Sequence, residues 1–108
     1  MNQSDFNLHC QNLIDEAEKI RNAKQPEYTK LSADVLANFK NSGKNLDVPA
    51  LYVWSIFMDK QLSSVQAHIK NPNLERAEPI ESRFADLYNY VLLGYALFKE
   101  LEERGTII

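Results

Sequence analysis

The stretch EPIESRFADLYNYVLLGYALFKELEERG, residues 78–105 of this 108-residue chain, decides the fold. It carries no charged residue from Leu87 to Phe98, and a helix that is apolar nearly all round is either buried or part of an interface. Pro79 suits the first turn of a helix, and Gly105 suits the position that follows the last turn. The sequence therefore predicts one long helix over 79–104.

This helix has two apolar sides. The main stripe consists of Phe84, Leu87, Val91, Tyr95 and Phe98. The second side consists of Tyr90, Leu93 and Leu97. One side can close a helical bundle, but the other needs a further partner, because a large exposed apolar patch is otherwise a liability. A second copy of the chain would supply that partner, so we predict a homo-oligomer, a dimer or a tetramer, formed through the last helix.

Apolar residues also recur at helical spacing in three earlier segments. The expected helices span 5–24, 33–40 and 47–70. Their expected ends are Ser4 and Pro26 for the first, Ser32 or Asp34 and Asn41-Ser42-Gly43 for the second, and Asp47 and Asn71-Pro72 for the third. We therefore expect a single all-α domain over 1–108, an antiparallel bundle of three main helices plus a short helix in the first connection.

Composition and charge bound the setting of the protein. The net charge of -3 and the pI of about 5.3 argue against direct nucleic-acid binding, which needs a basic surface. The apolar run at 87–98 is shorter than the roughly 20 residues that span a bilayer. The N-terminal residues lack the pattern of a signal peptide, and the one cysteine, Cys10, can form no internal disulfide. The sequence favours a cytoplasmic protein with no membrane partner.

The side chains of this sequence that could bind a ligand or a metal are mainly carboxylates. No serine or cysteine is paired with a histidine in a recognised pattern, and there is no glycine-rich phosphate loop. The carboxylates of interest are Asp15, Glu18, Asp59, Glu78, Glu81 and Asp86. Helical bundles build cation sites from inward carboxylates, and Mg²⁺ takes one or two of them with water and substrate phosphates. Asp59 and Asp86 are the candidate Mg²⁺ ligands, but all of these carboxylates also fit solvated helix faces.

Arg83, Asp86 and Asn89 follow one another at three-residue spacing, which places them on neighbouring turns of the last helix. Two interpretations fit this set. Buried, the residues form a network that fixes how the helices pack. Facing a groove, the arginine binds an anion while the carboxylate and the amide read polar groups. The residues alone leave both interpretations open.

Three segments resemble one known family: ADVLANFK at 33–40, YVWSIFMDKQLSSV at 52–65 and EPIESRFADLYNYVLLGYAL at 78–97. It is the nucleotide-modification-associated domain family, first kind, which consists of small helical proteins borne mostly by phages and prophages. Its motifs, an asparagine–phenylalanine pair, a W…DK stretch and an EPIxxRxxDxxNYxxLL signature, match Asn38, Phe39, Trp54, Asp59, Lys60, Glu78, Glu81, Arg83, Asp86, Asn89 and Tyr90. The resemblance implies a role in phage nucleotide metabolism or modification, in the cytoplasm of a bacterial host.

The arrangement is also similar to the all-α MazG-like nucleoside-triphosphate pyrophosphohydrolases. Those enzymes bind Mg²⁺ through an ExxE on one helix and an ExxD on the next, and they act as dimers or tetramers. Here the first motif is reduced to Asp59, and Arg83 stands where the glutamate of ExxD is expected. An arginine repels Mg²⁺ but binds phosphate well. The resemblance therefore implies nucleotide binding with, at most, a weak pyrophosphohydrolase activity.

We expect a nucleotide or another anionic ligand to bind between helices 47–70 and 79–104. The expected ligand-binding residues are Arg83, Asp86, Asn89, Asp59, Lys60, Glu81 and Asn38. In this set the basic side chains meet phosphate, and the others read polar groups or hold a cation. The alternative is a non-catalytic helical protein that serves oligomerisation or another protein interaction.

Overall fold

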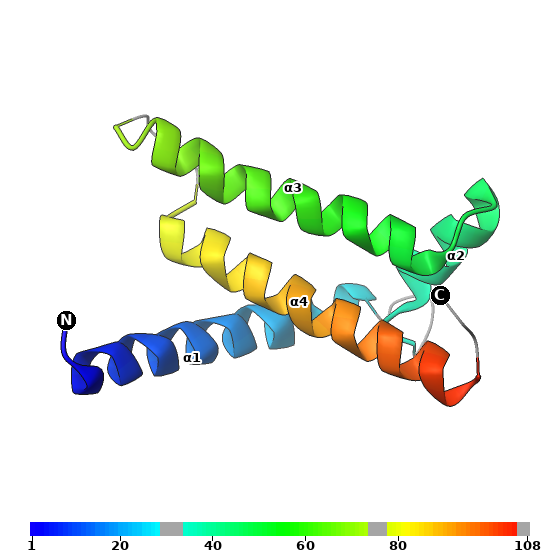
Figure 1. The fold of residues 1–108 in the computed structure, drawn as a ribbon, viewed down its shortest axis with the longest axis horizontal. Coiled ribbons are helices and arrows are strands. Elements are labelled where there is room, and N and C mark those ends of the chain that lie inside the picture. Colours follow the sequence, from blue (N-terminus) through cyan, green and yellow to red (C-terminus); the bar gives the residue numbers. More distant parts are fainter. Residues whose placement is uncertain (29–33, 74–77, 106–108) are drawn as a thin grey trace.

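A computed structural model of the chain describes residues 1–28, 34–73 and 78–105 (Figure 1). Within these residues lie the helices α1 (Gln3–Tyr28), α2 (Ala37–Leu46), α3 (Ala50–Lys70) and α4 (Ile80–Glu103). No strand occurs among them, so the all-α prediction is confirmed for this part of the chain. None of the described helices combines the length and the apolar composition that crossing a membrane requires.

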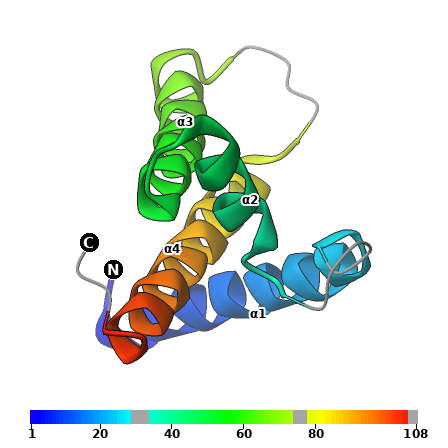
Figure 2. The same cartoon turned by 90° about the vertical axis from the view of Figure 1, so that its right-hand side faces the viewer.

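Helix α4 is the central element of the fold. It packs against α1 and against α3, which lie on different sides of it, while α2 packs against α3 (Figure 1, Figure 2). α3 and α4 run in opposite directions, as the predicted bundle requires, and α1 runs in the same general direction as α4 (Figure 1). The main core cluster consists of Leu36, Phe39, Val53 and Leu97. The core therefore sits where α2 meets the α3–α4 pair.

The contact between α3 and α4 is closest at Gly94, which is buried. A Cβ atom at this position would lie 2.2 Å from the Trp54 ring, so only glycine lets the indole approach the α4 backbone this closely. The indole Nε1 donates a hydrogen bond of 2.7 Å to the carbonyl oxygen of Tyr90. Glycine has a low helix propensity, yet Gly94 determines how closely α3 packs against α4.

The end of α2 differs from the sequence prediction. The prediction ended this helix at residue 40, with Asn41-Ser42-Gly43 as its stop, but the helix continues to Leu46. Gly43 is needed inside the helix because the chain folds back over it: a Cβ atom there would lie 2.7 Å from the Val48 carbonyl oxygen. Asp47 ends α2 in the left-handed conformation at φ 58°. It therefore does not cap α3 as predicted, and Pro49 occupies that position instead.

The ends of α1 also differ from the prediction. The Asn2 side chain accepts a hydrogen bond of 2.8 Å from the backbone N–H of Asp5, so Asn2 rather than Ser4 is the N-cap. Pro26 does not end the helix, which continues to Tyr28. A proline removes one backbone hydrogen bond, and this loss alone did not stop the last turn from forming.

Helix α2 begins later than residue 33, because Asp34 acts in the turn before it. The Asp34 carboxylate accepts a hydrogen bond of 2.9 Å from the backbone N–H of Leu36, so it orders this turn instead of capping the helix. Ser32, the other predicted cap, lies outside the described residues. Helix α4 is one residue shorter at each end than predicted: Pro79 is the N-cap and not a residue of the first turn. Gly105 follows the helix with a φ of 70°, as predicted.

The fold is open. Its radius of gyration is 15.9 Å, whereas a compact chain of this length has a radius of about 13 Å. Its accessible surface is 8028 Å² at a mass of 12.4 kDa, whereas a globular monomer of this mass exposes about 6100 Å². The chain therefore exposes about 1900 Å² more than its mass requires.

One face of α4 contributes to this extra surface, and we call it the α4 stripe. It consists of Phe84, the half-buried Tyr88, Val91, Tyr95 and Phe98. Phe84 is 41% exposed, Val91 48%, Tyr95 65% and Phe98 43%. The other apolar side of α4, with Tyr90, Leu93 and Leu97, faces the core. The second side recognised in the sequence thus closes the fold, and most of the main stripe is left without a covering helix.

Candidate functional site

Asn89 is buried on α4, and it binds α1. Its Oδ1 accepts a hydrogen bond of 3.0 Å from Arg21 Nη1, and its Nδ2 donates one of 2.9 Å to the carbonyl oxygen of Ala17. Ala17 has no exposed surface, so water cannot replace the amide as a donor to this carbonyl. Asn89 thus uses both ends of its amide to hold α1 against α4.

Asp86 and Arg83 pair with residues outside the predicted set. Asp86 lies 3.4 Å from Lys24 Nζ, which makes a second polar link between α4 and α1. Arg83 Nη1 lies 3.9 Å from the carboxylate of Glu78. The buried Nε of Arg83 has no hydrogen-bond partner among the described residues. Arg83 and Asp86 therefore do not form the ion pair with each other that their spacing allows.

The remaining predicted residues lie in three separate places. Asp59 and Lys60 are exposed on α3. Glu81 is exposed at a cleft of about 420 Å³ between α4 and α1. The α1 side of this cleft is formed by His9, Asn12, Leu13 and Glu16. Asn38 is exposed beside a different, smaller pocket. The structure thus distributes the seven predicted residues over several surfaces and does not line one groove with them.

The two candidate Mg²⁺ ligands lie on different helices, and neither belongs to a group of acidic side chains among the described residues. Asp86 pairs with Lys24, and Asp59 lies exposed on α3. In residues 1–28, 34–73 and 78–105, no three histidine, cysteine or acidic side chains come together as a metal-binding group. A Mg²⁺ ion at either carboxylate would have to complete its octahedral shell with water and ligand phosphates.

Three aromatic rings meet where α2 covers the α3–α4 pair. The rings of Phe57 and Tyr90 stack, with their centroids 6.3 Å apart and 16° between their planes. Phe39 meets both rings edge-on at 6.0 and 6.4 Å. A pocket of about 80 Å³ lies beside them, and Asn38 lines it together with Val35 and Leu93. The pocket offers ring faces and one amide, which suits a flat group with hydrogen-bonding edges.

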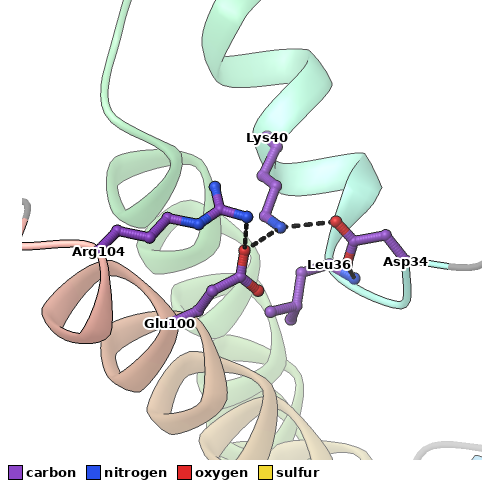
Figure 3. A network of polar contacts seen from close by, with 5 residues as sticks. All are labelled: Asp34, Leu36, Lys40, Glu100 and Arg104. Atoms are coloured by element: carbon purple, nitrogen blue, oxygen red, sulfur yellow. Dashed lines mark hydrogen bonds and ion pairs between the residues drawn. The ribbon is translucent and has the colours of Figure 1, made fainter.

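A charged network joins the start of α2 to the end of α4 (Figure 3). Lys40 Nζ lies 2.6 Å from a carboxylate oxygen of Asp34 and 2.5 Å from one of Glu100. Arg104 Nη2 donates to the same Glu100 oxygen at 2.8 Å. Two acids and two bases thus pair with one another, and they tie together segments 60 positions apart in the sequence.

The pKa values in this network move toward the charged forms. The hydrogen bond from Lys40, and after it the one from the Leu36 N–H, lower the pKa of Asp34. Burial by itself would lower the pKa of Lys40, but the hydrogen bonds to Asp34 and Glu100 outweigh it and raise that pKa. Neither group is brought toward neutral pH, where a general acid or base works best. The network is therefore structural in character.

Sequence reasoning missed the α1 partners of the predicted set. Arg21 and Lys24 pair with residues 68 and 62 positions further along the chain, and no local pattern announces such pairs. One signal was present. These two basic residues continue, at steps of four and three, the apolar stripe that contains Ala17. A cation on the buried side of a helix indicates a polar partner on the facing helix.

No family model, no curated protein and no solved structure matches the chain. Other apolar side chains are exposed as well, such as Ile56 and Ile69 on α3, but two features of the described residues bear on function. One is the α4 stripe, which is apolar and faces solvent. The other is the buried Nε of Arg83, which lacks a partner. A function has to be argued from these two features.

Proposed function

We propose that this chain is a non-catalytic helical protein that works by assembling into a homo-oligomer through α4. The observation that carries the proposal is the α4 stripe, a row of large apolar side chains facing solvent on the central helix. Two of the polar residues that looked like a site hold helices together, because Asn89 and Asp86 bind α1. Assembly would cover the apolar side chains of the α4 stripe, which face solvent in the single chain.

The size of the exposed surface supports this proposal. With roughly 200 Å² for a fully exposed aromatic side chain, the exposed parts of Phe84, Tyr95 and Phe98 amount to about 300 Å² in one chain. Two chains that cover these side chains gain roughly 15 kcal/mol, at 25 cal/mol per Å². Association costs about 4–15 kcal/mol in lost freedom, so the gain from three side chains alone is comparable with the largest cost.

Sedimentation equilibrium of the purified chain tests the proposal. We expect a mass of two or four times the 12.4 kDa of one chain, with a shift toward the monomer on dilution. Circular dichroism on the same samples shows whether the helices are formed. A folded chain that stays at 12.4 kDa up to its solubility limit would contradict the proposal.

A second candidate function is the binding of a nucleotide or another anionic ligand that carries a flat ring. The observation that favours it is Arg83, whose buried Nε has no partner among the described residues. Arg83 lies seven residues before Tyr90, hence on the same side of α4 and about 10 Å along it. A ring seated beside Phe57 and Tyr90 would point its phosphate toward Arg83, and Lys60, one turn after Phe57, would reach the same phosphate.

The resemblance to phage nucleotide-associated proteins supports this second candidate, and a weak pyrophosphohydrolase is its enzymatic form. Calorimetric titration with ribo- and deoxynucleotides, with and without Mg²⁺, tests it. Binding of one class that is lost in Arg83→Ala but kept in Lys44→Ala, an exposed cation on α2, would support it. Equal affinities in the two variants would count against a role of Arg83.

A further inference from the structure

We infer that the α4 stripe packs against the α4 stripe of a second copy, antiparallel, across a two-fold axis that passes near Val91. This inference rests on the proposed function, and it adds the partner surface, the direction of the two helices and the residues that meet. The reasons are the spacing of the stripe, the surface that the chain has to cover and the charges at the two ends of the stripe.

The α4 stripe has the spacing of a seam between two helices. Its members follow one another at intervals of four, three, four and three residues, from Phe84 to Phe98. An average interval of 3.5 residues is typical of helices that pack along their length. The row is also nearly symmetrical about Val91, with a phenylalanine seven residues away on each side. An antiparallel pair therefore sets Phe84 against the partner's Phe98 and Val91 against the partner's Val91.

The extra surface of the chain agrees with the area that a stable homodimer buries. One chain exposes about 1900 Å² more than a globular monomer of the same mass. Two chains that covered this surface would bury about 3800 Å², which lies within the 2000–5000 Å² of permanent complexes. The α4 stripe extends over about 21 Å, so it forms the centre of such an interface and not the whole of it.

The charges at the ends of the stripe favour the antiparallel direction. Glu81 lies in the first turn of α4 and Lys99 lies 18 residues later, five whole turns away and therefore on the same side. Within its own chain Lys99 pairs with Glu102 at 3.1 Å, and both side chains are exposed, so the ammonium group can also reach a partner. In an antiparallel pair each Glu81 comes beside the partner's Lys99. In a parallel pair the two carboxylates lie at one end of the interface and the two ammonium groups at the other, so the opposite charges do not pair. Helix dipoles oppose the parallel pair as well, because they place like partial charges together.

Cysteine cross-linking in a Cys10→Ser background tests this arrangement. We expect Val91→Cys to give a covalent dimer, because this position lies at the two-fold axis. Phe84→Cys alone should give none, because its two copies lie about 21 Å apart along the helices, whereas the Cα atoms of a disulfide are less than about 7 Å apart. An equal mixture of Phe84→Cys and Phe98→Cys should cross-link to the mixed dimer.

Each failure in this experiment has its own meaning. Cross-linking of Phe84→Cys with itself would overturn the antiparallel direction. A native oligomer in which no cysteine of the stripe cross-links would place the interface elsewhere on the chain; the inference and the role of α4 then fall, while assembly into a homo-oligomer stands. A folded, monomeric native chain would remove both.

A charge exchange tests the end contacts by a different measurement. E81K and K99E should each weaken the dimer by roughly five- to tenfold, because two attractive contacts become repulsive. The double variant E81K/K99E should return the dissociation constant to within about twofold of the native value. A double variant that is as weak as the single ones, or weaker, would overturn the pairing of these side chains.

Discussion

Asn89→Ala removes the amide that joins α4 to α1. The native side chain makes hydrogen bonds of 3.0 Å with Arg21 and 2.9 Å with the Ala17 carbonyl. Arg21 is only half-buried, so its guanidinium can turn to water after the replacement. The Ala17 carbonyl stays buried and loses its side-chain donor, while it keeps the helical hydrogen bond within α1.

The size of the loss follows from these two bonds. Losing a neutral hydrogen bond costs about 0.5–1.5 kcal/mol, and losing one from a charged donor costs about 1.5–3 kcal/mol. We therefore expect the free energy of unfolding to fall by about 2–4 kcal/mol, a large part of the 5–15 kcal/mol typical of a domain. The melting temperature should fall by about 10–20 °C.

Urea unfolding followed by circular dichroism measures this loss, at one fixed protein concentration, because assembly shifts the apparent stability. Asn22→Ala is the matched control: the same substitution at an exposed position of α1, where we expect a change within about 0.5 kcal/mol. A loss of less than about 1 kcal/mol for Asn89→Ala, or equal losses for the two variants, would refute a structural role of the amide.

Two further results are expected. Gly94→Ala should destabilise the protein by about 1–3 kcal/mol, although this change usually favours a helix, because the new methyl group meets the Trp54 ring; a gain in urea midpoint would show that α3 and α4 are not in this close contact. The lowered pKa of Asp34 gives a stability contribution that is present above its ordinary pKa of 3.8 and is lost as the pH falls through the lower, folded value. The raised pKa of Lys40 gives one that is present below 10.5 and is lost as the pH rises through the folded value. Unfolding curves measured across pH should show both losses in the native chain. In Lys40→Met the loss at high pH should be absent and the loss at low pH smaller, because the Leu36 N–H still lowers the pKa of Asp34; identical pH profiles would contradict the network.

The sequence predicts the helices better than it predicts their ends. The long helix through Leu97 and its end at Gly105 follow from local patterns, because apolar periodicity and glycine at a left-handed position act within a few residues. Gly43 was misread because its reason lies outside its own helix: the chain returns over it at Val48. Such a contact has no local signal, so a buried glycine looks like a helix stop.

The candidate site could be predicted only in its residues and not in their partners. Asn89 and Asp86 stand out because polar groups interrupt an apolar helix, yet their partners on α1 are fixed by tertiary packing. The two apolar sides of α4 were recognised from spacing, but spacing does not say which side the rest of the chain covers. The answer depends on α3, which packs against the side of α4 that contains Gly94, and on α1, which packs against the side that contains Asn89.

The comparison of Tyr95→Asp with Tyr52→Asp tests most directly whether the α4 stripe is the assembly surface. The two tyrosines are 65% and 61% exposed, so each substitution places the same charge on an equally accessible helix position. Sedimentation equilibrium should give a folded monomer of 12.4 kDa for Tyr95→Asp and the native oligomer for Tyr52→Asp. The same mass for both variants would contradict assembly through α4.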